Sequence, residues 1–189
     1  MSAGWRRVLN NPPHGCGADR TRALVRARAG VLSMSAHHVA PLPGMGSVDD
    51  LFIGHTKWWS PGYLGQVASR VGQVAVMSYD TALPTRPLYG GYVRRQTDVA
   101  LGAVPGHTDL LMGLPAFHTD NLGHHESAET VAAAVRSVRL ALGDNRRQRF
   151  GVALYVDFAA TDADWRAYHQ QWAASSQTPR PRNPGGGNS

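Results

Sequence analysis

Histidine, tyrosine and acidic side chains follow four apolar runs of the sequence. Carboxylates and imidazoles at the ends of buried runs serve in acid–base catalysis, in metal binding and in holding polar substrates. We expect them to form one polar site if the four runs end at a common edge. In chain order these residues are His37 and His38, then Tyr79 and Asp80, then His118, Asp120 and Asn121, and finally Asp157.

The four apolar runs, residues 31–36, 73–79, 109–114 and 150–156, contain no Lys, Arg or Glu. Uninterrupted apolarity of this length is typical of strands in a parallel sheet that is covered on both faces. The alternation of these runs with helical patterns predicts an α/β fold, a partial TIM-type barrel of about four strand–helix units. The four strand ends should then face one rim.

Helical patterns lie between and beside the runs. The first pattern begins at Ser60 and Pro61 and continues through Tyr63, Val67 and Val71; the second is marked by Val131, Val135, Val138 and Leu142 and ends at Gly143. A third helix is predicted from the capping box of Thr161 and Asp164, which precedes Trp165, Tyr168 and Trp172. Residues 96–104 predict a weaker helix, and residues 21–29 a possible short one.

The composition divides the chain into three segments. Residues 1–29 form a poorly patterned basic segment, residues 30–174 the half-barrel, and residues 175–189 a Pro-, Gly- and Ser-rich tail that we expect to be disordered. The net charge is +6, but six arginines and one aspartate precede Val31, so the rest of the chain is nearly neutral. This favours a solvated arm over a nucleic-acid partner.

Two short motifs carry a family resemblance. Residues 77–80 (Met-Ser-Tyr-Asp) resemble the strand-six Met-x-Tyr-Asp motif of chitinase-type, family 18 glycoside hydrolases. Residues 111–117 (Leu-Met-Gly-Leu-Pro-Ala-Phe) resemble the Gly-aliphatic-Pro-x-aromatic pattern of that family's strand seven. The four runs would then be strands five to eight of the barrel, and the resemblance covers roughly residues 30–172.

The resemblance implies a substrate and a division of roles. In that family the N-acetyl oxygen of the sugar attacks the anomeric carbon while a glutamic acid protonates the leaving oxygen. Tyr79 and Asp80 would line the acetamido subsite and act in catalysis, whereas a tyrosine filling the barrel mouth and an aspartate capping a turn are the structural alternative. We expect substrate contacts from Met77, His37, His118, Asp120, Tyr155, Asp157 and Trp58, with Tyr155 where the family usually has a tryptophan, and we expect no metal ligand and no cofactor.

The catalytic acid of the family has no counterpart here. The family's Asp-x-x-Asp-x-Asp-x-Glu run belongs to strand four, and upstream of Val31 the chain has only Asp19 and no glutamate. The two glutamates of the chain, Glu126 and Glu129, are expected at the start of the helix after strand seven, where they meet its N-terminal dipole. The sequence therefore predicts a truncated barrel with weak or no hydrolysis alone, since general-acid catalysis supplies about 10² to 10⁴ in rate.

Two other functions stay open. A metal-dependent hydrolase could use the rim histidines and aspartates, although no His-x-His or His-Glu-x-x-His pair occurs. A non-catalytic carbohydrate-binding remnant could stack sugars on Trp58 and Trp59 or on Tyr89 and Tyr92, which otherwise cover the core.

Partners and location follow from the same features. A half-barrel exposes two strand edges and its interior face, so we expect self-association or pairing with a missing N-terminal half around an oligosaccharide. No apolar run is long enough for a membrane span, and the first residues show no export signal, which makes a cytoplasmic location the default although full-length relatives may be exported. The single cysteine, Cys16, leaves the redox compartment undetermined.

Overall fold

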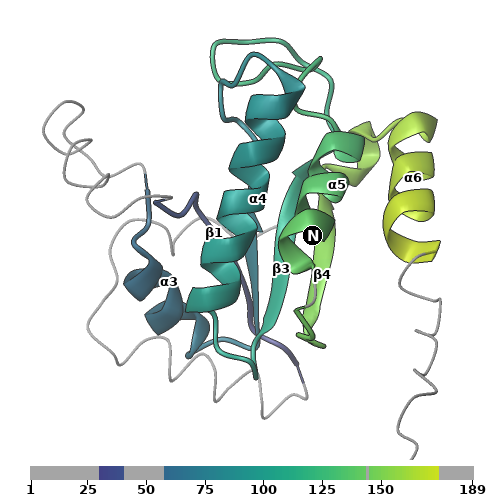
Figure 1. The fold of residues 1–189 in the computed structure, drawn as a ribbon. Coiled ribbons are helices and arrows are strands. Elements are labelled where there is room, and N and C mark those ends of the chain that lie inside the picture. Colours follow the sequence, from purple (N-terminus) through teal and green to yellow (C-terminus); the bar gives the residue numbers. More distant parts are fainter. Residues whose placement is uncertain (1–29, 41–57, 144, 175–189) are drawn as a thin grey trace, which may run out of the picture.

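The described chain is a parallel sheet with helices packed on one side (Figure 1). The computed structural model describes residues 30–40, 58–143 and 145–174, so the predictions for residues 1–29 and 175–189 lie outside the described residues. The strands are β1 (Ser33–Ala36), β2 (Gln73–Met77), β3 (Asp109–Pro115) and β4 (Phe150–Tyr155). The helices are α3 (Pro61–Ala68), α4 (Arg86–Ala103), α5 (Val131–Leu142), the 3₁₀ turn η1 (Asp157–Ala159), α6 (Asp162–Tyr168) and the π-helical turn η2 (His169–Ala173).

The strand order is β1-β2-β3-β4, and every neighbouring pair is parallel. Because parallel strands share a direction, their carboxyl ends lie along one edge of the sheet. Four parallel strands alternating with helices confirm the predicted α/β class and are consistent with a partial TIM-type barrel. The expected strands are found within two residues of their predicted bounds.

The helices cover one face of the sheet. Val76 on β2 and Met112 and Leu114 on β3 are fully buried and form the core with α4 and α5. Burial of each such side chain contributes about 1.5–3 kcal/mol, so this face holds the fold together. Ala75 and Leu111 alternate with them on the opposite face and stay partly exposed, so the prediction of strands covered on both faces holds fully only on the helix side.

Local signals fix the helix ends as the sequence predicts. The Ser60 hydroxyl accepts the Tyr63 N–H at the start of α3, and α5 ends at Gly143, whose φ of 43° suits glycine. Thr161 and Asp164 form the capping box of α6. Val71 lies beyond the end of α3, although it is buried in the core.

Helix α4 is longer than predicted, since it begins at Arg86 and not near residue 96. Its first turns contain Pro87, Gly90 and Gly91, which weaken the helical pattern. Tertiary packing explains Gly90, because a Cβ there would lie 2.8 Å from the Ser137 hydroxyl on α5. The two helices approach closely at this point and hold each other in place.

Candidate functional site

The end of β2 is fixed by buried hydrogen bonds. Ser78 donates from its backbone N–H and from its hydroxyl to the Gly113 carbonyl of β3, at 3.1 and 2.5 Å. The Tyr89 hydroxyl on α4 donates to the Ser78 carbonyl at 2.9 Å. Tyr89 has no exposed surface, which corrects the prediction that it could be a sugar-stacking platform. Its role is to anchor the strand end from which Tyr79 and Asp80 project.

Three aromatic side chains meet at the carboxyl edge, and we call Tyr79, Phe117 and Tyr155 the aromatic trio. The rings of Tyr79 and Tyr155 stack with centroids 4.8 Å apart and planes within 2°. Phe117 contacts both rings edge-on, at 5.9 and 6.0 Å. Tyr79 is almost fully buried, whereas Tyr155 keeps half of its surface exposed. The trio therefore has one exposed ring, Tyr155, one partly buried ring, Phe117, and one buried ring, Tyr79.

Gly113 explains how Tyr79 reaches across β3 to a tyrosine at the end of β4. A Cβ at Gly113 would lie 3.3 Å from the Tyr79 ring and 3.3 Å from the Val76 carbonyl oxygen, closer than most side-chain contacts. Glycine leaves room for the ring. Position 113 therefore requires a residue without a side chain, because any larger one would crowd the Tyr79 ring.

The Tyr79 hydroxyl is a neutral hydrogen-bond donor. Burial raises the pKa of Tyr79 well above its usual value, and nearby Tyr155 and Asp80 raise it further. Met77 is the last residue of β2 and pairs with Gly113. The strand end therefore presents a neutral phenol beside the Asp80 carboxylate.

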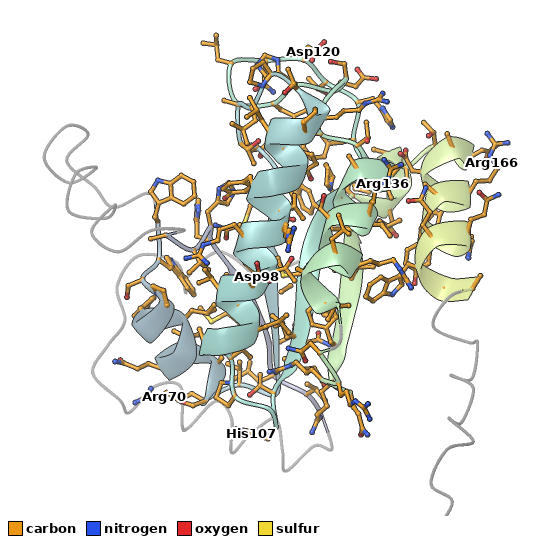
Figure 2. The ribbon with its side chains drawn as sticks, viewed as in Figure 1. Arg70, Asp98, His107, Asp120, Arg136 and Arg166 are labelled. Atoms are coloured by element: carbon orange, nitrogen blue, oxygen red, sulfur yellow. The ribbon has the colours of Figure 1, made fainter. Side chains whose placement is uncertain are left out.

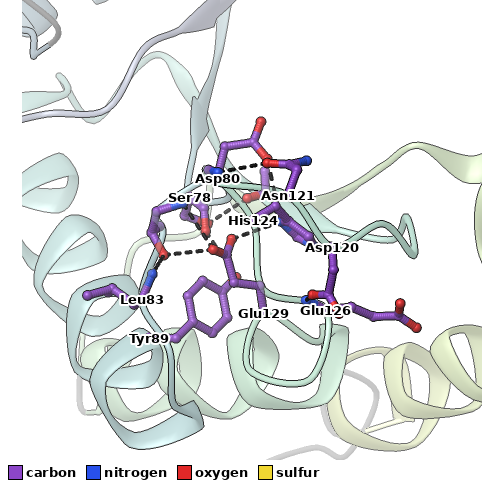
Figure 3. Close-up of polar contacts among 12 residues, drawn as sticks. Ser78, Asp80, Leu83, Tyr89, Asp120, Asn121, His124, Glu126 and Glu129 are labelled. Atoms are coloured by element: carbon purple, nitrogen blue, oxygen red, sulfur yellow. Dashed lines mark hydrogen bonds and ion pairs between the residues drawn. The ribbon is translucent and has the colours of Figure 1, made fainter.

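Asp80 leaves the strand in a strained loop. Asp80 and Ala82 have φ angles of 58° and 56°, the left-handed region that residues other than glycine seldom adopt. The Ala82 N–H donates to the Gly123 carbonyl at 2.8 Å, and Thr81 donates from its N–H and hydroxyl to Glu129 at 3.0 and 2.9 Å. These bonds tie the loop after β2 to the loop after β3 (Figure 3).

His124 and Glu129, which we call the buried pair, lie beneath Asp80. The two side chains have no exposed surface, and His124 Nδ1 is 3.2 Å from Glu129 Oε2 and 3.4 Å from Asp80 Oδ1. The sequence had suggested His124 only as one of several rim histidines for a metal site, and neither residue was predicted to contact Asp80. Glu129 was expected to meet the dipole of the following helix, which is wrong: Thr130 caps α5, the first turn holds no acid, and Glu129 turns inward to Thr81. Glu126 also precedes that helix.

A second histidine of the same loop lies nearer the surface. His118 Nε2 is 2.8 Å from Asp164 on α6 and Nδ1 is 3.1 Å from Glu126. The hydrogen bond that Asp164 accepts from the ring raises the pKa of His118 above its usual value, and Glu126 adds to the shift. Asp120, at the carboxyl edge in Figure 2, accepts the Glu126 N–H at 2.8 Å. His118 and Asp120 thus meet through Glu126.

The residues after β1 form a separate group. The Tyr92 hydroxyl and His38 Nδ1 lie 2.9 Å apart, and Trp58 contacts both rings edge-on. His37 lies 5.5 Å from the His38 ring. Burial raises the pKa of the Tyr92 hydroxyl, so it stays protonated. This group forms a second, partly buried aromatic cluster after β1.

Asp157 lies in η1, where its carboxylate accepts the N–H of Phe158 at 3.0 Å. This turn-capping contact is local, and the side chains of both residues are exposed. The contacts therefore join the predicted site residues into four groups: Tyr79 with Tyr155; Asp80 on the buried pair; His118 with Asp120; and His37, His38 and Trp58.

No group of three or more His, Cys, Asp and Glu residues in the described ranges is arranged to hold a metal ion. Asp80 and Glu129 both lie near the same nitrogen of His124, Nδ1, at 3.4 and 3.2 Å. No helix among the described residues is long and apolar enough to cross a membrane.

Comparison with solved structures finds a chitinase from Chromobacterium violaceum ATCC 12472, with a TM-score of 0.51 and 14% sequence identity. The chain shares part of its fold with a chitinase. The likeness covers 82% of this chain and 60% of that one, so the chain spans well under the whole length of the chitinase. No family model and no curated protein matches the sequence. At this identity the likeness shows the fold alone.

Proposed function

We propose that the carboxyl edge of the sheet binds oligomers of β-linked N-acetylhexosamine, as one half of a family 18-like barrel. The observation that carries this proposal is the stacking of Tyr79 on Tyr155 with Asp80 adjacent. Sugar sites combine an aromatic face, which packs on C–H groups, with a few fixed polar groups that set orientation. The aromatic trio and Asp80 supply both kinds of contact.

In this proposal Tyr155, Tyr79 and Asp80 make different contacts with the sugar, according to how exposed each side chain is. The exposed part of Tyr155 stacks on the sugar ring, although less broadly than a tryptophan would. The neutral Tyr79 hydroxyl donates to the acetamido oxygen, and Asp80, whose side chain is half exposed, accepts from the amide or a hydroxyl. His118, Asp120, Asp157 and Trp58 would extend the contacts along the rim.

Hydrolysis by this chain alone should be very weak. Glu129 is fully enclosed and Glu126 faces His118, so the described residues offer no glutamic acid beside the aromatic trio. Without a general acid, the rate falls by about 10² to 10⁴. In this proposal a partner of different sequence supplies the acid, and the chain alone binds without appreciable turnover.

The test compares sugars and variants by titration calorimetry. Chitotetraose should bind and cellotetraose, which lacks the acetamido group, should bind at least about tenfold more weakly, a difference of about 1.4 kcal/mol. Tyr155→Ala and Asp80→Asn should each weaken chitotetraose binding by about tenfold. Trp165→Ala, which removes an exposed aromatic side chain of α6, should leave it unchanged.

Turnover gives a second readout. A chromogenic chitobioside should be cleaved at most slowly by the wild type, and more slowly still by Tyr79→Phe and Asp80→Asn. Equal and robust cleavage by all three proteins would reject this site. Equal affinity for the two tetrasaccharides would reject the substrate class.

A further inference from the structure

Asp80 has one side in contact with the buried pair and the other open to solvent. Its side chain is half exposed, while His124 and Glu129 beneath it are not exposed at all. In Figure 3 Glu129 lies between Tyr89 and His124, at the centre of the contacts that join the two loops. The carboxylate that would face a ligand is thus backed by an imidazole and a second carboxylate.

Packing alone does not explain a histidine at position 124. Both of its ring nitrogens are buried and neither makes a hydrogen bond of good geometry with the described residues, which costs about 1–3 kcal/mol for each such atom. Nδ1 nevertheless lies within ion-pair distance of Asp80 and Glu129, at 3.4 and 3.2 Å. The ring packs 4.3 Å from Phe117, a place that an apolar side chain would fill without that cost. The contacts of Nδ1 with Asp80 and Glu129 are what distinguish the imidazole from an apolar ring.

Glu129 contacts the backbone that follows Asp80 and, through His124, the Asp80 carboxylate. Its Oε1 accepts the Thr81 N–H and hydroxyl, which holds the backbone directly after Asp80. Its Oε2 faces His124, whose Nδ1 lies against the Asp80 carboxylate. The left-handed φ of Asp80 is strained, and strain of this kind persists only where surrounding contacts hold it.

We propose that Glu129 and His124 are positioning residues that fix the Asp80 carboxylate for ligand binding. The inference rests on the proposed sugar site, since it explains how that site is kept in shape. A carboxylate held in one rotamer binds more tightly than a mobile one, because its freedom is already lost before the ligand arrives.

The binding test is a double-mutant cycle between Glu129→Gln and Asp80→Asn. Glu129→Gln keeps an acceptor for Thr81 but removes the charge that faces His124. It should weaken chitotetraose binding about tenfold in the wild type and less than about twofold in the Asp80→Asn background. A purely structural role would give the same fold-loss in both backgrounds. Asp98→Asn, which removes an exposed charge from α4, should change neither affinity.

A ligand-free test separates this inference from the proposed function. The χ1 rotamer of Asp80, measured by three-bond NMR couplings, should be single in the wild type and in Asp98→Asn. It should be averaged in Glu129→Gln and in His124→Phe, which keeps the packing on Phe117. Failure of the wild type to bind chitotetraose would reject the sugar site but leave this test standing. An unchanged Asp80 rotamer in His124→Phe would overturn the positioning role, even if Glu129→Gln did not fold.

Discussion

Two histidines on the loop between β3 and α5 each face two carboxylates, and they differ chiefly in burial. His124 and Glu129 have no exposed side-chain surface, whereas His118 is 37% and Asp164 is 10% exposed. In water-excluded surroundings a charge contact is strong and the loss of one partner is severe, while near the surface solvent and salt weaken it. The same pairing chemistry therefore fixes a loop in one place and responds to pH in the other.

The largest difference in stability should appear when each histidine loses one of its two carboxylate partners. Glu129→Ala removes the acceptor for two Thr81 groups and leaves His124 buried without its partner, so we expect the free energy of unfolding to fall by about 3–5 kcal/mol. Glu126→Ala makes the same change at the partner of His118 that is 44% exposed, and should cost less than about 1 kcal/mol. Urea unfolding measures both.

Similar losses in these two variants would remove the distinction between a buried and a surface pair. A loss below about 1 kcal/mol for Glu129→Ala would mean that the loop after β2 is held by other contacts, such as that of Ala82 with Gly123.

A smaller effect is expected at Thr161, which holds the surface pair of His118 and Asp164 in place. Thr161 donates its hydroxyl and its N–H to Asp164, at 2.7 and 2.9 Å, and so orients the carboxylate that faces His118. Thr161→Ala should lower the free energy of unfolding by about 1 kcal/mol, the usual cost of a lost helix cap. Thr161→Ser keeps the hydroxyl and should leave the free energy of unfolding almost unchanged, since serine caps helices at least as well as threonine. Thermal unfolding of the two variants provides the comparison.

Local sequence signals predicted most of the fold. The apolar runs gave the strands because parallel strands are short and continuously apolar, and the cap residues Ser60, Thr161 and Gly143 set helix ends. The start of α4 was missed because Gly90 and Gly91 conceal a helix that tertiary packing stabilises. Sequence patterns therefore predict an element or its end where contacts within a few residues determine it.

The candidate site was only partly predictable. Tyr79 and Tyr155 could be expected to meet because they follow parallel strands, although the exact stacking depends on Gly113. Glu129 and His124 could not, because the bond between Glu129 and Thr81 joins residues 48 positions apart. A glutamate immediately before the Thr130 cap was the one available signal, and it equally suited a helix dipole.

The smallest expected effect is the pH dependence of the stability that the surface pair, His118 and Asp164, contributes. The pKa of His118 is raised, so its contribution to stability is complete below the usual value of 6.5 and is lost as pH rises through the folded value. Burial raises the pKa of Asp164, but its bonds from Thr161 and His118 outweigh this and hold it below 3.8, so its contribution is complete above 3.8 and is lost as pH falls through the folded value. Both contributions are complete only between pH 3.8 and 6.5.

His118→Gln should therefore be less stable than the wild type at about pH 5, by no more than about 0.5 kcal/mol because the side chain is over a third exposed. The difference should vanish at about pH 9, where the imidazole is neutral, and should shrink at pH 5 when about 1 M NaCl screens the charges. The loss in Glu129→Ala should persist at the same salt concentration, because burial shields its contacts from ions. A His118→Gln difference that ignores both pH and salt would show that His118 acts through packing and neutral hydrogen bonds, and that burial is not what separates the two histidines.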